Sequence, residues 1–186
     1  MEKIPDTGRL PLVIDSREAA RTGRVLEGAF EIRRLARLVT MLSHEGGLLA
    51  WRAAFERKER PDGGHDDFVH LRLDGEVSMQ CVRCLGDARI PVHLERGFRL
   101  VANEVQAARE DAEEAEFDVL AGGPRFDLGE LIEDEAIMAL PPIARHDNCD
   151  LPLGAAGPQG AAGEEMPGEE RIRPFAGLAD LKKRGH

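Results

Sequence analysis

The segment VHLRLDGEVSMQC, residues 69–81, alternates apolar and polar side chains almost without interruption. Successive side chains of a β-strand point to opposite faces, so this period of two predicts a long strand with one buried face. The same alternation precedes it at residues 49–55 and follows it at 90–94, continued loosely to residue 100. A turn sequence, PDGG, lies at residues 61–64. We therefore predict an antiparallel meander over residues 48–100.

Two helical segments flank this sheet. Apolar residues recur at spacings of three and four over residues 32–42, which predicts one amphipathic helix. A second helix is predicted over residues 127–140, where Asp127 and Glu130 have the spacing of a capping box and two prolines end the pattern. Short apolar strands are expected at 10–14 and 25–30. The fold class is therefore α+β, an antiparallel sheet or meander flanked by two main helices.

The chain divides into three parts by composition. An α+β domain is expected over residues 8–152. Residues 153–171 are rich in Gly, Ala, Pro and Glu and predict a disordered linker. Residues 172–186 predict a short amphipathic basic segment, which either binds a partner or docks back on the domain. Its candidate partner-binding residues are Phe175, Leu178, Leu181, Lys182, Lys183 and Arg184.

Charge is unevenly distributed in this chain of 186 residues with a net charge of −10. Residues 102–135 contain twelve acids and two bases, whereas residues 171–186 contain five bases and one acid. The acidic balance argues against a protein that coats nucleic acid. The acidic stretch is either a solvated surface or a face that meets a basic partner. The candidates for that face are Glu130, Glu133, Asp134 and Glu135.

Residues 103–116 are mostly acids and alanines and predict a mobile surface loop or a weak helix. The sequence has no signal-peptide pattern and no apolar run long enough to span a membrane. We therefore expect a cytoplasmic protein with no membrane partner.

The three cysteines and one histidine form two close pairs. Cys81 and Cys84 make a C-x-x-C followed by glycine, and His146 and Cys149 follow far downstream. Four such ligands are the set of a structural zinc site, so we expect the three sulfurs and one imidazole nitrogen within about 4 Å of one another. A redox C-x-x-C and buried, unliganded thiols are the alternatives. A redox motif normally opens a helix, whereas this one joins two predicted strands.

A disulfide framework is not expected, because the number of cysteines is odd and nothing indicates export. No catalytic constellation is found either. The sequence lacks a P-loop, a G-x-G-x-x-G and a G-x-S-x-G motif. Residues 133–135 are consecutive acids that a helix spreads by 100° each, which favours a solvated helix start over an acid/base pair. A zinc ion with four protein ligands has no open position for water. We therefore predict that the chain is not an enzyme.

Four segments resemble the bacterial YceD family of large ribosomal RNA subunit accumulation proteins. They are LPLVID at 10–15, QCVRCL at 80–85, FDLGELIEDEAIMALP at 126–141 and PFAGLADLK at 174–182. The resemblance implies a role in the synthesis, processing or stability of 23S ribosomal RNA, without an established enzymatic activity.

Two modes of action are compatible with that resemblance. We favour a ribosome biogenesis factor that engages a ribosomal protein or an rRNA maturation factor through its acidic face. The alternative is a direct RNA-binding module that contacts precursor 23S rRNA through Arg33, Arg34, Arg37 and the basic tail.

Overall fold

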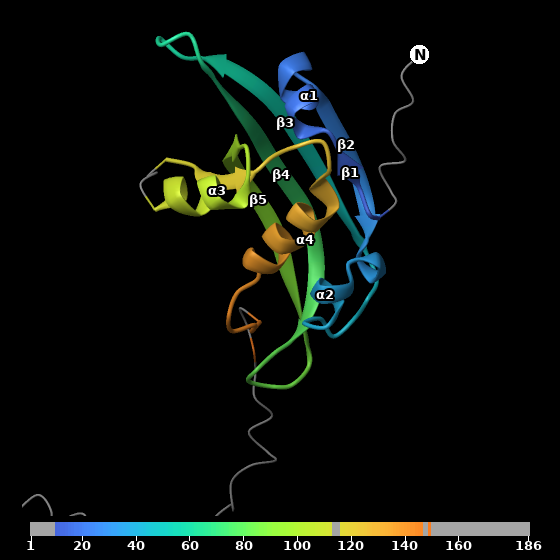
Figure 1. Cartoon of the computed structure of the whole chain (residues 1–186). Coiled ribbons are helices and arrows are strands. Elements are labelled where there is room, and N and C mark those ends of the chain that lie inside the picture. Colours follow the sequence, from blue (N-terminus) through green and yellow to red (C-terminus); the bar gives the residue numbers. More distant parts are fainter. Residues whose placement is uncertain (1–9, 113–115, 147–148, 150–186) are drawn as a thin grey trace, which may run out of the picture. The chain divides into compact units, whose positions relative to one another are not determined.

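Strand β4, His65–Gln80, forms the middle of a five-stranded sheet in this computed structural model, which describes residues 10–112, 116–146 and 149. The strand order is β2-β3-β4-β5-β6 (Figure 1). The bounds of the others are Val25–Glu31 for β2, Leu48–Glu59 for β3, Asp87–Val101 for β5 and Asp118–Ala121 for β6. The pairs from β2 to β5 are antiparallel, which confirms the predicted meander.

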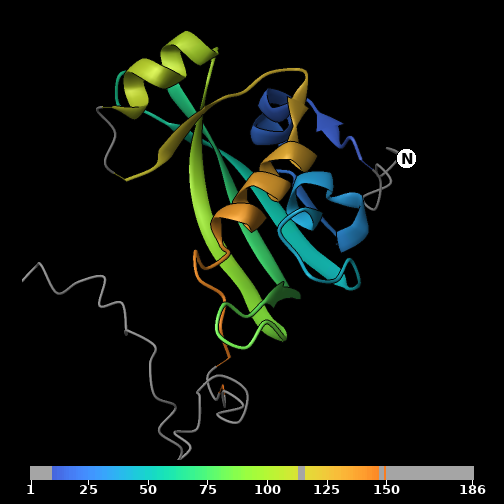
Figure 2. The same ribbon diagram turned by 90° about the horizontal axis from the view of Figure 1, so that it is seen from below.

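The buried face of the sheet is the one that the alternation in the sequence predicted. Val69, Leu71 and Leu73 of β4 are completely buried and pack in one hydrophobic core with Leu128 and Ile132 of helix α4, Leu128–Met138. Figures 1 and 2 show α4 lying across this face beside α2, Ala36–Val39. The predicted α+β class is therefore confirmed for the described residues.

Helix α4 begins where the sequence predicted. The side chain of Asp127 accepts a hydrogen bond from the backbone N–H of Glu130, as an N-cap residue does. Just before the helix, strand β7, Phe126–Asp127, pairs with β1, Val13–Ile14, in a separate two-stranded sheet. The expected strand near residue 10 thus exists but lies outside the main sheet.

The prediction of one amphipathic helix over residues 32–42 is wrong. The segment forms a 3-10 turn, Ile32–Arg34, and the one-turn helix α2, interrupted at Leu35 with φ −91° and ψ 85°. Ile32, Leu35 and Leu38 are nevertheless all fully buried. A 3-10 turn also brings every third residue to one side, so the apolar spacing was correct while the helix type was not.

Helix α3, Glu104–Asp111, resolves the choice left open for residues 103–116 over the part that the structure describes. Asn103 is its N-cap and accepts from the backbone N–H of Gln106. The helix packs on β6 through a small cluster of Val101, Ala107 and Val119. Strand β6 pairs in parallel with β5, so the sheet is mixed and not purely antiparallel.

Helix α1, Ser16–Thr22, was not predicted. Asp15 caps its first turn, and Gly23 ends it in the left-handed conformation, φ 63°. All described residues belong to the first of two units, Met1–Leu151. The predicted linker at 153–171 and basic segment at 172–186 lie outside the described residues, so those boundaries stay predictions. No helix of the described part combines the length and hydrophobicity that crossing a bilayer requires.

Candidate metal centre

The connection between β4 and β5 is a tight turn built around Cys81 and Cys84. The backbone N–H of Cys81 donates to the carbonyl of Gly86 at 2.8 Å, and that of Leu85 donates back to the carbonyl of Cys81 at 2.9 Å. Leu85 takes the left-handed backbone, φ 61°, that glycine usually supplies. The C-x-x-C therefore lies at a strand-to-strand tip, as its flanking alternation predicted.

A second segment, about 60 residues later in the sequence, packs against this turn. After α4 the backbone passes through residues 141–146 and lies against the turn, where the N–H of Val82 donates to the carbonyl of Ala144 at 3.0 Å. Ala144 is buried in the main core. This contact places His146 and Cys149 next to the first cysteine pair.

The four predicted ligands converge. The sulfurs of Cys81 and Cys149 are 3.8 Å apart, and the sulfur of Cys84 is 3.6 Å from Nδ1 of His146. All four potential ligand atoms lie within 4.8 Å of one another. Zinc–sulfur bonds of about 2.3 Å at tetrahedral angles separate two sulfurs by about 3.8 Å. The arrangement therefore fits a tetrahedral ion, with some pairs slightly wider than the predicted 4 Å.

The ring of His146 is held in a metal-binding orientation. Its Nε2 atom lies 2.6 Å from the backbone carbonyl oxygen of Asp87. A carbonyl only accepts hydrogen bonds, so Nε2 carries the hydrogen and the lone pair of Nδ1 faces the sulfurs. Metal-binding histidines commonly donate their second N–H to a carbonyl in this way. The side chain of Asp87 in turn bonds His44, at 2.7 Å.

The cysteines differ in their protonation. Backbone N–H groups, first that of Cys84 and then those of Arg83 and His146, lower the pKa of Cys81 to about 6. Burial is the main cause that raises the pKa of Cys149 to about 11. The bond to the Asp87 carbonyl raises the pKa of His146. The turn thus favours the thiolate of Cys81, whereas burial disfavours that of Cys149 unless a cation is bound.

The surroundings favour a metal over a redox function. A C-x-x-C that exchanges disulfides needs an accessible thiolate at a helix N-terminus. Cys81 is completely buried and lies between two strands. Its lowered pKa comes from backbone N–H groups of a turn, which are also the groups that stabilise a metal-bound thiolate.

The acids of α4 have two different environments. Glu133 and Glu135 are buried, with only 8% and 7% of their surface exposed, whereas Glu130 is exposed and Asp134 is intermediate. The expectation that residues 133–135 form a solvated helix start is therefore wrong for two of the three. Each buried carboxylate has a partner within the fold.

Glu133 caps another helix. Its Oε1 atom accepts from the backbone N–H groups of Arg37 at 2.7 Å and Leu38 at 3.1 Å. These are early N–H groups of α2, which has no cap from its own N-cap side chain. Elsewhere along α4, Glu135 binds Arg96 of β5 at 3.1 Å. The sequence signalled the acids but not their partners, which are distant in the chain.

The arginines of the alternative RNA-binding hypothesis are also engaged within the fold. Arg33 and Arg34 bond Glu31 at 2.9 and 3.2 Å. Arg37 forms ion pairs with Glu133 and Asp134. The tail candidates lie outside the described residues, so their proposed contacts stay predictions: Phe175, Leu178, Leu181, Lys182, Lys183 and Arg184.

Comparison with known families adds one finding. A family model described as large ribosomal RNA subunit accumulation protein YceD matches residues 69–182, more than half of the chain. The match begins in β4 and includes the β4–β5 turn, α4 and all four residues of the Cys/His cluster. No curated protein and no solved structure matches significantly.

Proposed function

The chain belongs to the YceD family of large ribosomal RNA subunit accumulation proteins, and we propose that it is a non-enzymatic ribosome biogenesis factor with a structural zinc ion. In this proposal it supports the synthesis, processing or stability of 23S ribosomal RNA by engaging a ribosomal protein or an rRNA maturation factor. The observation that carries the zinc proposal is the convergence of Cys81, Cys84, His146 and Cys149.

Zinc is the metal that this ligand set favours. Three thiolates and one imidazole suit a four-coordinate, tetrahedral ion. Four protein ligands occupy every position, so the ion does not activate water. Its role is then to join the β4–β5 turn to the segment that follows α4, two parts of the chain that few other bonds connect at this end of the sheet.

The zinc site formed by Cys81, Cys84, His146 and Cys149, here called the clamp, should give a fixed shape to the surface that binds the partner. Helix α4 carries Glu130 on its exposed side. Asp127 caps the start of α4, and Glu133 further along the helix binds α2, so the carboxylates of α4 have defined positions. We propose that the acidic face, of which Glu130 and the half-buried Asp134 remain accessible, contacts a basic protein.

Large-subunit RNA accumulation tests the role of the clamp. Cells that lack the chain are complemented with the wild-type protein, with His146→Gln, or with His93→Gln as a matched control. His93 is an exposed histidine that bonds Asp74 on the open face of the sheet. The proposal predicts a low ratio of 23S to 16S RNA for His146→Gln alone. Equal ratios for both variants at equal protein level would contradict it.

Capture from cells tests the partner. The tagged chain is isolated with and without nuclease, and co-purifying ribosomal proteins and maturation factors are quantified. A protein that remains after nuclease treatment and is lost in Glu130→Lys supports the acidic face. Glu76→Lys is the control, because Glu76 is also exposed but lies on β4. Loss of every such protein on nuclease treatment would favour direct RNA binding.

A further inference from the structure

A polar cavity of about 390 Å³ lies where β3 turns into β4. Arginines from four different places line it: Arg17 of α1, Arg57 of β3, Arg60 of the turn and Arg99 of β5. The Cys/His cluster follows the opposite end of β4, a strand of 16 residues with an extended length of about 50 Å. The cavity is therefore a separate site.

The four arginines are held with different strength. Arg57 makes a two-bond pair with Asp67, at 2.6 and 2.9 Å, in which the carboxylate is largely buried. That geometry is typical of a structural pair. By contrast, Asp66 is 3.4 Å from Arg60 and 3.9 Å from Arg99, longer than a charge-assisted hydrogen bond of about 2.8 Å.

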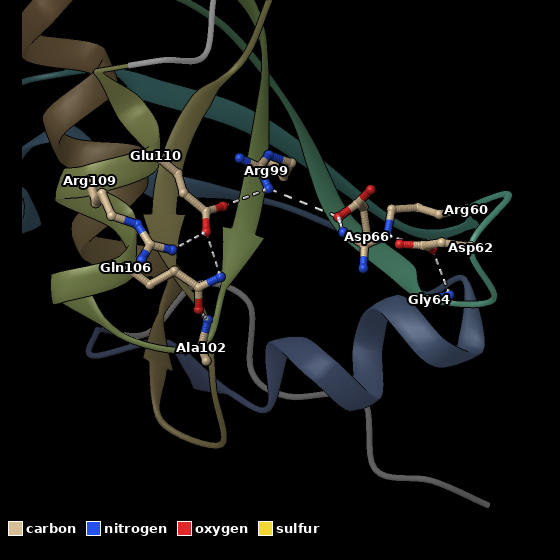
Figure 3. Close-up of polar contacts among 9 residues, drawn as sticks. All are labelled: Arg60, Asp62, Gly64, Asp66, Arg99, Ala102, Gln106, Arg109 and Glu110. Carbon is tan, nitrogen blue, oxygen red and sulfur yellow. Dashed lines mark hydrogen bonds and ion pairs between the residues drawn. The ribbon is translucent and has the colours of Figure 1, made fainter.

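Figure 3 shows Arg99 between Asp66 on the hairpin side and Glu110 of α3 on the other. Its bond to Glu110, at 3.0 Å, anchors the guanidinium and leaves Asp66 as the loosely held group of the cavity. Arg17 differs again. Within the described part of the chain, its guanidinium contacts the carbonyl of Ala102 at 3.3 Å and no carboxylate.

The lining carries a surplus of positive charge. Four arginines face three lining carboxylates, Asp66, Asp67 and Glu110, for a formal sum of +1, and Arg60 also pairs with Asp62 outside the lining at 3.3 Å. Guanidinium groups bind phosphate through paired N–H donors. The volume is in the range of small-ligand sites. Among the described residues that line the cavity, His65 is the one ring-bearing side chain, so the site offers mainly phosphate contacts and little surface for stacking bases.

We propose that this cavity binds a phosphate group of an RNA strand, with Arg17 and Arg60 as its direct ligands and Arg99, anchored by Glu110, as a further positive charge. The choice of RNA among phosphate carriers rests on the proposed role in 23S RNA accumulation, to whose protein contact it adds a contact with the RNA backbone. The binding of phosphate by these arginines is inferred from their arrangement alone and does not depend on the proposed function. Recognition here is independent of base sequence, because only the backbone is contacted.

The test is RNA binding by the purified full-length chain. A labelled oligouridylate is titrated at several salt concentrations and followed by fluorescence anisotropy. We expect Arg17→Gln and Arg60→Gln each to bind about tenfold more weakly. Each should also lower the slope of log K against log salt by about 0.7, the value for one lost phosphate contact on a single strand. Arg17→Lys should keep the slope, since it keeps the charge.

Arg89→Gln is the control. Arg89 is exposed, is loosely paired with Glu76 at 3.5 Å, and lies near the other end of the sheet. It removes the same charge and should keep wild-type affinity. Thermal melting checks that the cavity variants remain folded. Equal loss in Arg89→Gln and Arg17→Gln, or no RNA binding by the folded wild type, would overturn the inference.

Competition with inorganic phosphate distinguishes a site for RNA from a site that binds phosphate in general. Inorganic phosphate should displace the oligouridylate from the wild type and have little effect on the residual binding of a double variant, Arg17→Gln with Arg60→Gln, which lacks both direct ligands. If phosphate perturbs the cavity while RNA does not bind, the RNA assignment fails. That failure is distinct from a failure of the proposed function, which His146→Gln tests in cells through a site at the other end of β4.

Discussion

The Nε2 atom of His146 donates a hydrogen bond to the backbone carbonyl of Asp87 at 2.6 Å. Asp87 is the first residue of β5, whereas His146 follows α4. The bond therefore fixes the imidazole to the sheet and turns Nδ1 toward the sulfur of Cys84, 3.6 Å away. A histidine in this position is prepared for a metal before the metal arrives.

Removal of zinc should destabilise the fold. At free zinc of about 100 times its dissociation constant, binding contributes about 2.7 kcal/mol to the free energy of unfolding. For a domain of this size that corresponds to about 5–10 °C in melting temperature. A chelator should cause this shift in the wild type and in His93→Ala. His146→Ala should melt early and respond little to the chelator. An identical response of all three proteins would contradict a bound ion.

Replacement of Glu133 should destabilise the chain, although the sequence around this residue has the acidic pattern of a solvated helix. Glu133→Ala leaves two N–H groups at the start of α2 without their acceptor and should cost about 2–3 kcal/mol. Glu133→Gln keeps one oxygen acceptor and should cost less. Urea unfolding measures both. The exposed Glu130→Ala should remain within about 0.5 kcal/mol of the wild type. Equal effects at the two positions would show that Glu133 is not a cap.

The pH dependence of stability should differ in sign between two glutamates. Burial raises the pKa of Glu135. A raised folded-state pKa gives stability that is present below the unfolded pKa and is lost as pH rises through the folded pKa. Glu135→Gln should therefore gain stability relative to the wild type as pH rises from the unfolded carboxyl pKa near 4.5 toward neutrality. Unfolding curves across that range give the difference.

Glu56 is the opposite control for this experiment. Hydrogen bonds from Lys58 and His70 lower its pKa. Its contribution is then present above the unfolded pKa and lost as pH falls, so Glu56→Gln should lose relative stability as pH rises. Parallel pH trends for the two variants would contradict the assigned environments.

The sequence predicted those parts of the fold that depend on local pattern. The alternation in residues 69–81 correctly placed β4 and its buried face, and Asp127 correctly marked the start of α4. The four Cys/His residues were paired by spacing and by ligand type, and the structure brings them together.

The sequence could not predict features set by tertiary contacts. Spacings of three do not distinguish a 3-10 turn from a helix, so residues 32–42 were assigned to one helix. The parallel pairing of β6 joins residues such as Phe98 and Asp118, which are 20 positions apart. The capping of α2 by Glu133 joins residues 96 positions apart. The carbonyl of Asp87 had no sequence signal at all, because every residue has one.

Deletion of residues 172–186 tests the basic tail, which lies outside the described residues. We expect this segment, with its single apolar stripe, not to dock on the domain. Its deletion should then change the free energy of unfolding by no more than about 1 kcal/mol. The deletion should nevertheless lower accumulation of 23S RNA in the complementation assay. A much lower melting temperature would show that the tail belongs to the fold, and normal melting with full complementation would remove its recruiting role.

The most direct test of the central claim is zinc-edge X-ray absorption on the chain purified without added metal. We predict one zinc per chain, with three sulfur neighbours at about 2.3 Å and one nitrogen at about 2.0–2.1 Å. We also predict that Cys149→Ser replaces one of the sulfurs by a lighter neighbour or loses the metal. A chain that is folded and contains no zinc, or zinc with water among its neighbours in the wild type, would contradict the structural clamp.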